Sequence, residues 1–148
     1  MANINNTVEN YLLSQNYKFE KLDGNRGFSL MMNANIFSNM RVIIYTKERS
    51  FVCYAVAPIN APENKRAALA EFIARANYGM PLVTFELDFN DGEIRTRTSL
   101  QCADQTPPMT AVEAVVDSVT ILLDKYAPGI NSVLFANVSP QAAIASIE

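Results

Sequence analysis

The sequence contains no histidine and only 2 cysteines among its 148 residues. Histidine is the commonest general base and the commonest zinc ligand in proteins, so its absence removes the usual Ser-His and Cys-His catalytic pairs. Two cysteines without histidine are also too few for a structural zinc site. We therefore expect no enzymatic activity, no catalytic residue, no metal site and no cofactor.

The chain also lacks a long apolar run and a basic cluster, and we expect no signal peptide. No stretch approaches the ~20 apolar residues that span a bilayer, and residues 1–6 have neither the basic nor the apolar region of a secretory signal. The 12 Lys and Arg against 15 Asp and Glu give a formal net charge of −3, and Lys65 and Arg66 are the only adjacent basic pair. We expect a cytoplasmic protein that binds neither membranes nor nucleic acid.

The composition that remains is typical of a globular protein. Hydrophobic residues make up 49% of the chain and charged residues 18%, and a chain of this length buries roughly two-thirds of its unfolded surface. We expect a single domain over residues 1–148. Two widely spaced cysteines in a cytosolic chain, here Cys53 and Cys102, are usually small buried residues rather than a disulfide.

Residue patterns predict an α+β fold, because the strands come in hairpins rather than alternating with helices, as in a mainly antiparallel sheet. The predicted order is α-β-β-β-α-β-β-α with a short C-terminal helix. The predicted helices cover residues 7–15, 62–76, 110–126 and 141–147, and the strands cover residues 27–33, 40–47, 51–57, 83–89 and the segment after Gly92. Residues 18–22 are expected to be extended, Ala127-Pro128-Gly129 to end the third helix, and residues 131–136 to form a last extended piece.

Two central strands, residues 40–47 and 51–57, are apolar on both faces. A tight connection at residues 48–49 predicts that Ile44 faces Cys53 and that Tyr45 faces Val52. Strands of this kind are typical of the centre of a covered sheet or of a subunit interface, and methionines beside them either fill a core or line an adaptable partner surface. The predicted partner or dimer surface consists of Met31, Met40, Ile43, Tyr45, Val52 and Tyr54.

A second hairpin is predicted to turn at residues 91–92, where Asp-Gly tolerates the positive φ of a two-residue turn. That turn places two carboxylates opposite arginines, Asp88 opposite Arg95 and Glu86 opposite Arg97. Two carboxylates on one face are a candidate acid–base pair, but pairing with arginines across the hairpin favours a structural role. The acidic loop lacks the spread of oxygen ligands that a calcium-binding loop needs.

Several segments resemble the YbjN-type domain. They are Ala-Asn-Tyr-Gly at residues 76–79, the strand at 83–89, Asp-Gly-Glu-Ile-Arg at 91–95, the helix at 110–126 with Tyr-Ala-Pro at 126–128, and Ser-Pro-Gln-Ala-Ala-Ile at 139–144. The resemblance covers residues 8–148. It implies a fold like that of type III secretion chaperones, a strongly bent antiparallel sheet with helices packed on it, often dimeric. The family is described as bacterial sensory-transduction regulators, and it has no catalytic residues to carry over.

These features lead to two hypotheses about function. The first is a non-enzymatic protein-binding module, chaperone-like or regulatory, that forms a homodimer and binds an extended peptide or an amphipathic helix of a protein partner in a groove. The alternative is a small-molecule sensor with an apolar pocket between helix and sheet.

Overall fold

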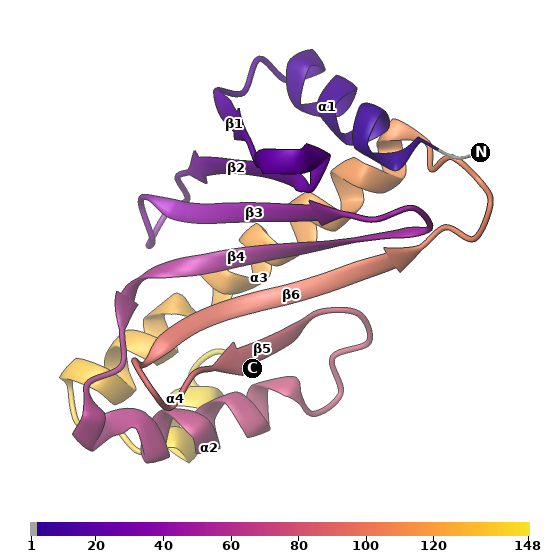
Figure 1. The fold of residues 1–148 in the computed structure, drawn as a ribbon. Coiled ribbons are helices and arrows are strands. Elements are labelled where there is room, and N and C mark those ends of the chain that lie inside the picture. The colour runs from indigo at the N-terminus through magenta and orange to yellow at the C-terminus, as the bar shows by residue number, and fades with distance from the viewer. Residues whose placement is uncertain (1–2) are drawn as a thin grey trace.

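The computed structural model describes residues 3–148, which form helices packed on a six-stranded sheet (Figure 1). The helices are α1 (Ile4–Ser14), α2 (Arg66–Asn77), α3 (Met109–Phe135) and α4 (Pro140–Ala145), and the strands are β1 (Phe19–Lys21), β2 (Gly27–Met32), β3 (Met40–Thr46), β4 (Ser50–Asn60), β5 (Thr84–Leu87) and β6 (Glu93–Gln101). The sheet has the order β1-β2-β3-β4-β6-β5, and each neighbouring pair is antiparallel. The predicted α+β fold with an antiparallel sheet is confirmed.

One strand more than predicted precedes α2. The extended segment expected at residues 18–22 contains the edge strand β1, so the element order is α-β-β-β-β-α-β-β-α-α. β1 pairs Phe19 with Leu30 on β2. Its last residue, Lys21, forms an ion pair with Glu9 of α1 at 2.7 Å, which connects this edge of the sheet to the first helix.

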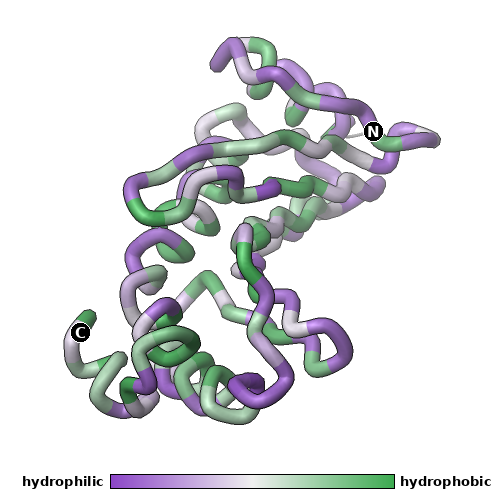
Figure 2. The backbone as a smooth tube through the Cα atoms, turned by 90° about the vertical axis from the view of Figure 1, so that its left-hand side faces the viewer, coloured by the Kyte–Doolittle hydropathy of each residue, from purple (hydrophilic) through white to green (hydrophobic). Residues whose placement is uncertain are grey.

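The helices cover one face of the sheet and its two ends. In Figure 1, α3 runs behind the sheet, α1 lies at the β1 end, and α2 and α4 lie at the β5 end. Figure 2, a side view coloured by hydropathy, shows hydrophobic and hydrophilic residues interspersed along the chain, which ends near the bottom, where α4 contacts α2. Within residues 3–148, no helix lies across the face of the sheet that points toward the viewer in Figure 1.

The packing of α3 on the sheet forms the centre of the core. Val116, Val119 and Leu123 on α3 are fully buried, as are Ile44 and Cys53 on the sheet. The pairing of Ile44 with Cys53, predicted from the tight connection between β3 and β4, is confirmed. Both thiols, those of Cys53 and Cys102, are free and buried.

The sheet bends where β4 changes its register against β6. The ladder shifts between Val56 and Asn60, and Pro58 lies between them without a backbone N–H to donate. β4 continues through this irregularity to Asn60, three residues beyond the predicted end at residue 57. In Figure 1 it turns down toward α2. This irregularity produces the bent sheet that the family resemblance implies.

Two helices begin earlier than predicted. α1 begins at Ile4 because Asn3 caps it: the Asn3 side-chain oxygen accepts a hydrogen bond from the Asn6 N–H at 3.0 Å. Ile4 is 2% exposed, so the extra turn adds apolar contact. α3 begins at Met109, one residue before the predicted start and directly after Pro108.

The third helix does not end at the predicted stop and runs through Pro128 to Phe135. A proline inside a helix removes one hydrogen bond and strains the preceding turn. The residues beyond it continue the apolar face, and Ile130 and Val133 are buried. A Cβ at Gly129 would meet the Phe72 ring of α2 at 2.7 Å, so the small residue lets two helices approach closely. Packing outweighs the local stop signal, and the piece predicted to be extended, residues 131–136, is helical as far as Phe135.

The hairpin between β5 and β6 has a register that differs from the prediction by two residues. Glu86 pairs with Arg95, and Leu87 pairs with Ile94. The loop is longer than two residues, because the Gly92 N–H donates to the carbonyl of Asp88 at 2.7 Å. Only Gly92 of the predicted Asp-Gly turn has a positive φ, 82°. A shift of two residues keeps every side chain on its predicted face.

Gly92 is predicted to be less replaceable than Gly79. Both have positive φ, 82° and 85°, so an alanine costs about 1–2 kcal/mol at either position. Only at Gly92 would the added Cβ overlap the backbone of Ala61, whereas nothing lies within 4 Å at Gly79. We therefore expect Gly92→Ala to lower the free energy of unfolding, measured with urea, by about 1–3 kcal/mol more than Gly79→Ala does. Equal losses for the two variants would contradict the close approach of this loop to Ala61.

Candidate protein-binding face

Strand alternation places five of the six predicted partner-surface residues on the uncovered side of the sheet. The ladder pairs Ile43 with Tyr54 and Tyr45 with Val52, and these four side chains point the same way because side chains alternate along a strand. Met31 of β2 lies on this side too, opposite Arg41. We call this side the open face. It is formed by Met31, Arg41, Ile43, Tyr45, Val52, Tyr54, Val56, Arg95, Arg97 and Ser99, with Glu20, Ser29, Thr84, Glu86 and Glu93 along its edges.

Met40 is the exception, and its assignment to the partner surface is wrong. Its side chain is 0% exposed and packs in the core. It precedes Arg41 on the same strand, so alternation turns it toward α3. The apolar pattern on both faces of β3 could not show which side a helix covers. Of the two roles considered for the methionines, Met40 has the core role and Met31, 57% exposed, lies on the open face.

The centre of the open face is aromatic and aliphatic. The rings of Tyr45 and Tyr54 meet edge to face, with centroids 6.1 Å apart. Tyr45 is 39% exposed, and Ile43, Val52 and Tyr54 are half-buried. A solvated face of an antiparallel sheet normally carries polar side chains. An apolar centre on this side therefore marks it as a candidate interaction surface.

Arginines border this centre on the side of β6. The Arg95 guanidinium lies 4.1 Å from the centroid of the Tyr54 ring, a cation–π contact. Arg95 and Arg97 donate to the two carboxylate oxygens of Glu86 at 2.8 Å and 3.0 Å. Sequence reasoning paired these arginines with carboxylates but did not place them on the partner surface. Their alternation along β6 was visible in the sequence, but the pairing of β6 with β4, which places Arg97 opposite Tyr54, was not.

The candidate acid–base pair does not form. Glu86 contacts both arginines, whereas the Asp88 carboxylate accepts a hydrogen bond from the Asn90 N–H at 2.8 Å within the loop. The two carboxylates thus have separate structural partners. One holds arginines on the open face and the other shapes the hairpin loop.

The remaining reactive groups are buried. Burial raises the pKa of the Cys53 thiol, and it raises the pKa of Cys102 as well. Burial and a hydrogen bond to Glu148 raise the pKa of Tyr126 to about 12. All three groups therefore stay protonated at neutral pH, and a protonated thiol is a poor nucleophile.

Besides hollows of about 380 Å³ at the β5–β6 hairpin and about 630 Å³ beside β1 and β2, three smaller ones were candidates for a small-molecule site. One lies on the open face beside Tyr45 and Arg97, with a volume of about 310 Å³. A second lies between α3 and the sheet, with a volume of about 250 Å³, and is lined by Met32, Met40 and Ile121. Small-molecule sites usually measure about 300–1,000 Å³, so the hollow between helix and sheet is small for the predicted sensor pocket.

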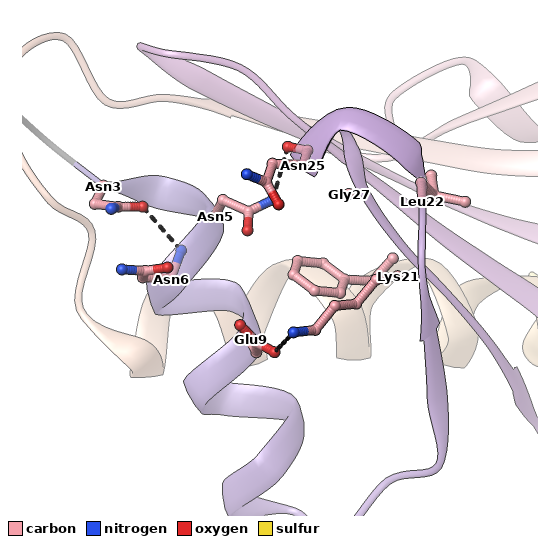
Figure 3. Close-up of a pocket in the computed structure, with 9 residues that line it drawn as sticks. Asn3, Asn5, Asn6, Glu9, Lys21, Leu22, Asn25 and Gly27 are labelled. Atoms are coloured by element: carbon pink, nitrogen blue, oxygen red, sulfur yellow. Dashed lines mark hydrogen bonds and ion pairs between the residues drawn. The ribbon is translucent and has the colours of Figure 1, made fainter.

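The third hollow, of about 220 Å³, lies between α1 and the start of the sheet and is polar (Figure 3). Its side chains bind one another. Asn5 donates to the Asn25 carbonyl at 2.9 Å and to the Thr46 hydroxyl at 2.8 Å, and Lys21 contacts Glu9. These bonds connect α1 to β1 and to the turn before β2, and so have a structural role.

Two further properties hold for residues 3–148. Their Cys, Asp and Glu side chains form no group of three or more that could hold a metal ion. None of the helices among them combines the length and the apolar character needed to cross a membrane.

Comparison with known proteins identifies similar sequences and structures. The model of the YbjN family, described as "Putative bacterial sensory transduction regulator", matches residues 6–132. The crystal structure of YbjN from E. coli is similar with a TM-score of 0.62 and 16% identity, over 89% of this chain and 90% of that one. No protein with a curated function matches the sequence.

A type III secretion chaperone has a related fold. The crystal structure of Yersinia pestis SycH in complex with a stable fragment of YscM2 is similar with a TM-score of 0.54 and 17% identity, over 83% of this chain and 96% of that chain. At this identity the likeness shows the fold. It confirms the chaperone-like architecture that the sequence resemblance implied.

Adjacent residues of β3 are predicted to differ in their tolerance of charge. Ile44 is 0% exposed, so Ile44→Asp buries an unpaired carboxylate. We expect this variant to lose more than about 4 kcal/mol of its free energy of unfolding. Ile43 lies on the open face, where an aspartate remains hydrated and the loss should be about 1 kcal/mol. Urea unfolding of both variants measures the difference. Comparable losses would mean that the open face is covered in the free protein.

Proposed function

Since the chain belongs to the YbjN family, we propose that it is a non-enzymatic protein-binding module, regulatory or chaperone-like, that binds its partner on the open face. One observation carries this proposal: within residues 3–148, no helix covers a sheet face whose centre holds Ile43, Tyr45, Val52 and Tyr54. Tyrosine and arginine are the residue types most enriched among the dominant contacts of protein interfaces, and the open face presents both.

The geometry of the face favours a protein ligand over a small molecule. Its apolar side chains are spread over β2, β3 and β4 rather than gathered around a deep cavity. Covering them removes apolar surface from water at about 25 cal/mol per Å². Ordered strands hold these side chains in place before binding, so little conformational entropy is lost when a partner docks.

The chaperone comparison supports the proposal by analogy. The SycH structure contains a bound fragment of YscM2, so a chain of this fold can hold a segment of another protein. Fold likeness alone does not carry function, and the argument for this chain therefore rests on the open face. The homodimer and the cytoplasmic location predicted from the sequence stay predictions within this proposal.

Site-specific photo-cross-linking tests the proposed face. We expect the Tyr45→p-benzoylphenylalanine variant to cross-link a protein partner in native lysate. The control is Phe135→p-benzoylphenylalanine at the end of α3, where the side chain is 65% exposed. Excess wild-type protein should abolish the Tyr45 products, whereas excess Val52→Asp should not, because a charge in the centre of the face disfavours apolar contact.

The competition makes the result specific to the face. Identical products from both positions, or equal competition by wild type and Val52→Asp, would contradict binding at the open face. Absence of any product from position 45 in native lysate would count equally against it.

A further inference from the structure

Four cations lie on or beside the open face. Arg41, Arg95 and Arg97 lie on it. The backbone N–H of Lys47 donates to the carbonyl of Ser50 at 2.8 Å and so continues the hairpin beyond β3. Strand alternation therefore places Lys47 on the same side as Tyr45. Glutamates lie on the same side at β1, β5 and β6, so the cations that matter for a partner are those without an acidic neighbour.

The acidic residues on this side lie away from two of the four cations. Glu86 pairs with Arg95 at 2.8 Å and with Arg97 at 3.0 Å, Glu93 lies 3.8 Å from Arg95, and Asp88 lies in the same hairpin. Glu20 lies at the far edge on β1, opposite Ser29. Within residues 3–148, neither Arg41 nor Lys47 forms an ion pair, and both are exposed.

The unpaired cations lie at the two ends of the apolar strip on β3. The side chains of Arg41, Ile43 and Tyr45 alternate along one face, and Lys47 is next in that series. At about 3.4 Å per residue, the two cations are roughly 20 Å apart. A complementary segment is therefore apolar in its middle and acidic toward both ends.

We propose that the open face binds an acidic protein segment, with apolar residues against Ile43, Tyr45 and Val52 and carboxylates near Arg41 and Lys47. This inference rests on the proposed function and adds the chemistry of the partner. Charge complementarity of this kind guides docking and excludes partners of the wrong sign.

Two other occupants fit the face less well. A nucleic acid carries a phosphate at every nucleotide and would bring negative charge toward Glu86 and Glu93 as well, whereas an acidic protein segment needs carboxylates only near Arg41 and Lys47. A second copy stacked face to face would place the same four cations against one another, and like charges across an interface disfavour association. Both occupants are outcomes of the experiment below.

Selection from a peptide library tests the inference without knowledge of the natural partner. The intact protein is immobilised, and a displayed library of random 12-residue peptides is selected against it, with Val52→Asp as the counter-selection. We expect the enriched peptides to carry an excess of Asp and Glu flanking aromatic or aliphatic residues. Fluorescence polarisation then measures the affinity of the most enriched peptide.

Charge-reversal variants provide the matched control. Arg41→Glu combined with Lys47→Glu should weaken the selected peptide by about tenfold or more. Arg75→Glu combined with Lys125→Glu changes the net charge equally at exposed positions on α2 and α3, and should leave the affinity within about twofold. Raising the salt concentration from 50 to 500 mM should weaken binding to the wild type.

Each other result overturns the inference. Enriched peptides without an acidic excess but dependent on Val52 would refute the acidic partner and leave the proposed function intact. No enrichment at all would refute both. Binding of a 20-residue oligothymidine that displaces the selected peptide would favour nucleic acid, and a dimer that Val52→Asp dissociates would favour a second copy.

Discussion

The packing of one long helix against one face of the sheet is the contact on which the rest of the structure depends. α3 spans 27 residues, and its buried residues meet the inward side chains of β3, β4 and β6, which include Ile44 and Cys53. Thr96 reinforces the contact, because its hydroxyl donates to the carbonyl of Val119 at 2.7 Å. This one layer of helix covers one side of the sheet, so the alternate residues of the same strands face outward.

The outward residues divide into two kinds, and that division carries the functional argument. β6 follows the usual rule for a solvated face and presents Arg95, Arg97 and Ser99. β3 and β4 depart from the rule and present Ile43, Tyr45, Val52 and Tyr54. Departures from consistent patterning concentrate at functional sites in natural proteins. The apolar strip bordered by cations is such a departure, and the buried thiols and paired carboxylates elsewhere offer no competing site.

Sequence reasoning succeeded where local chemistry determines the geometry. The tight connection at residues 48–49 determined the register of β3 against β4, and alternation then placed five of the six predicted surface residues together. It failed where tertiary contacts decide. The β5–β6 loop is held against Ala61, which the turn residues alone could not indicate. α3 continues through Pro128 because the following turns pack on Phe72.

The candidate site shows the same limit. Both faces of β3 read as apolar, and only the position of α3 decides that Met40 is inside and Met31 is outside. The border of Arg41, Arg95 and Arg97 became visible once the strand order placed β6 beside β4.

Methionine oxidation tests the central claim, that one face of the sheet is packed and the other is open. Met31 and Met40 have the same intrinsic chemistry and lie near the same end of the β2–β3 ladder, but their exposures are 57% and 0%. Peroxide treatment of the native protein, followed by mass spectrometry, measures both rates. The structure predicts rapid oxidation of Met31 and oxidation of Met40 only on unfolding. Equal rates, or protection of Met31 in the isolated protein, would contradict the account.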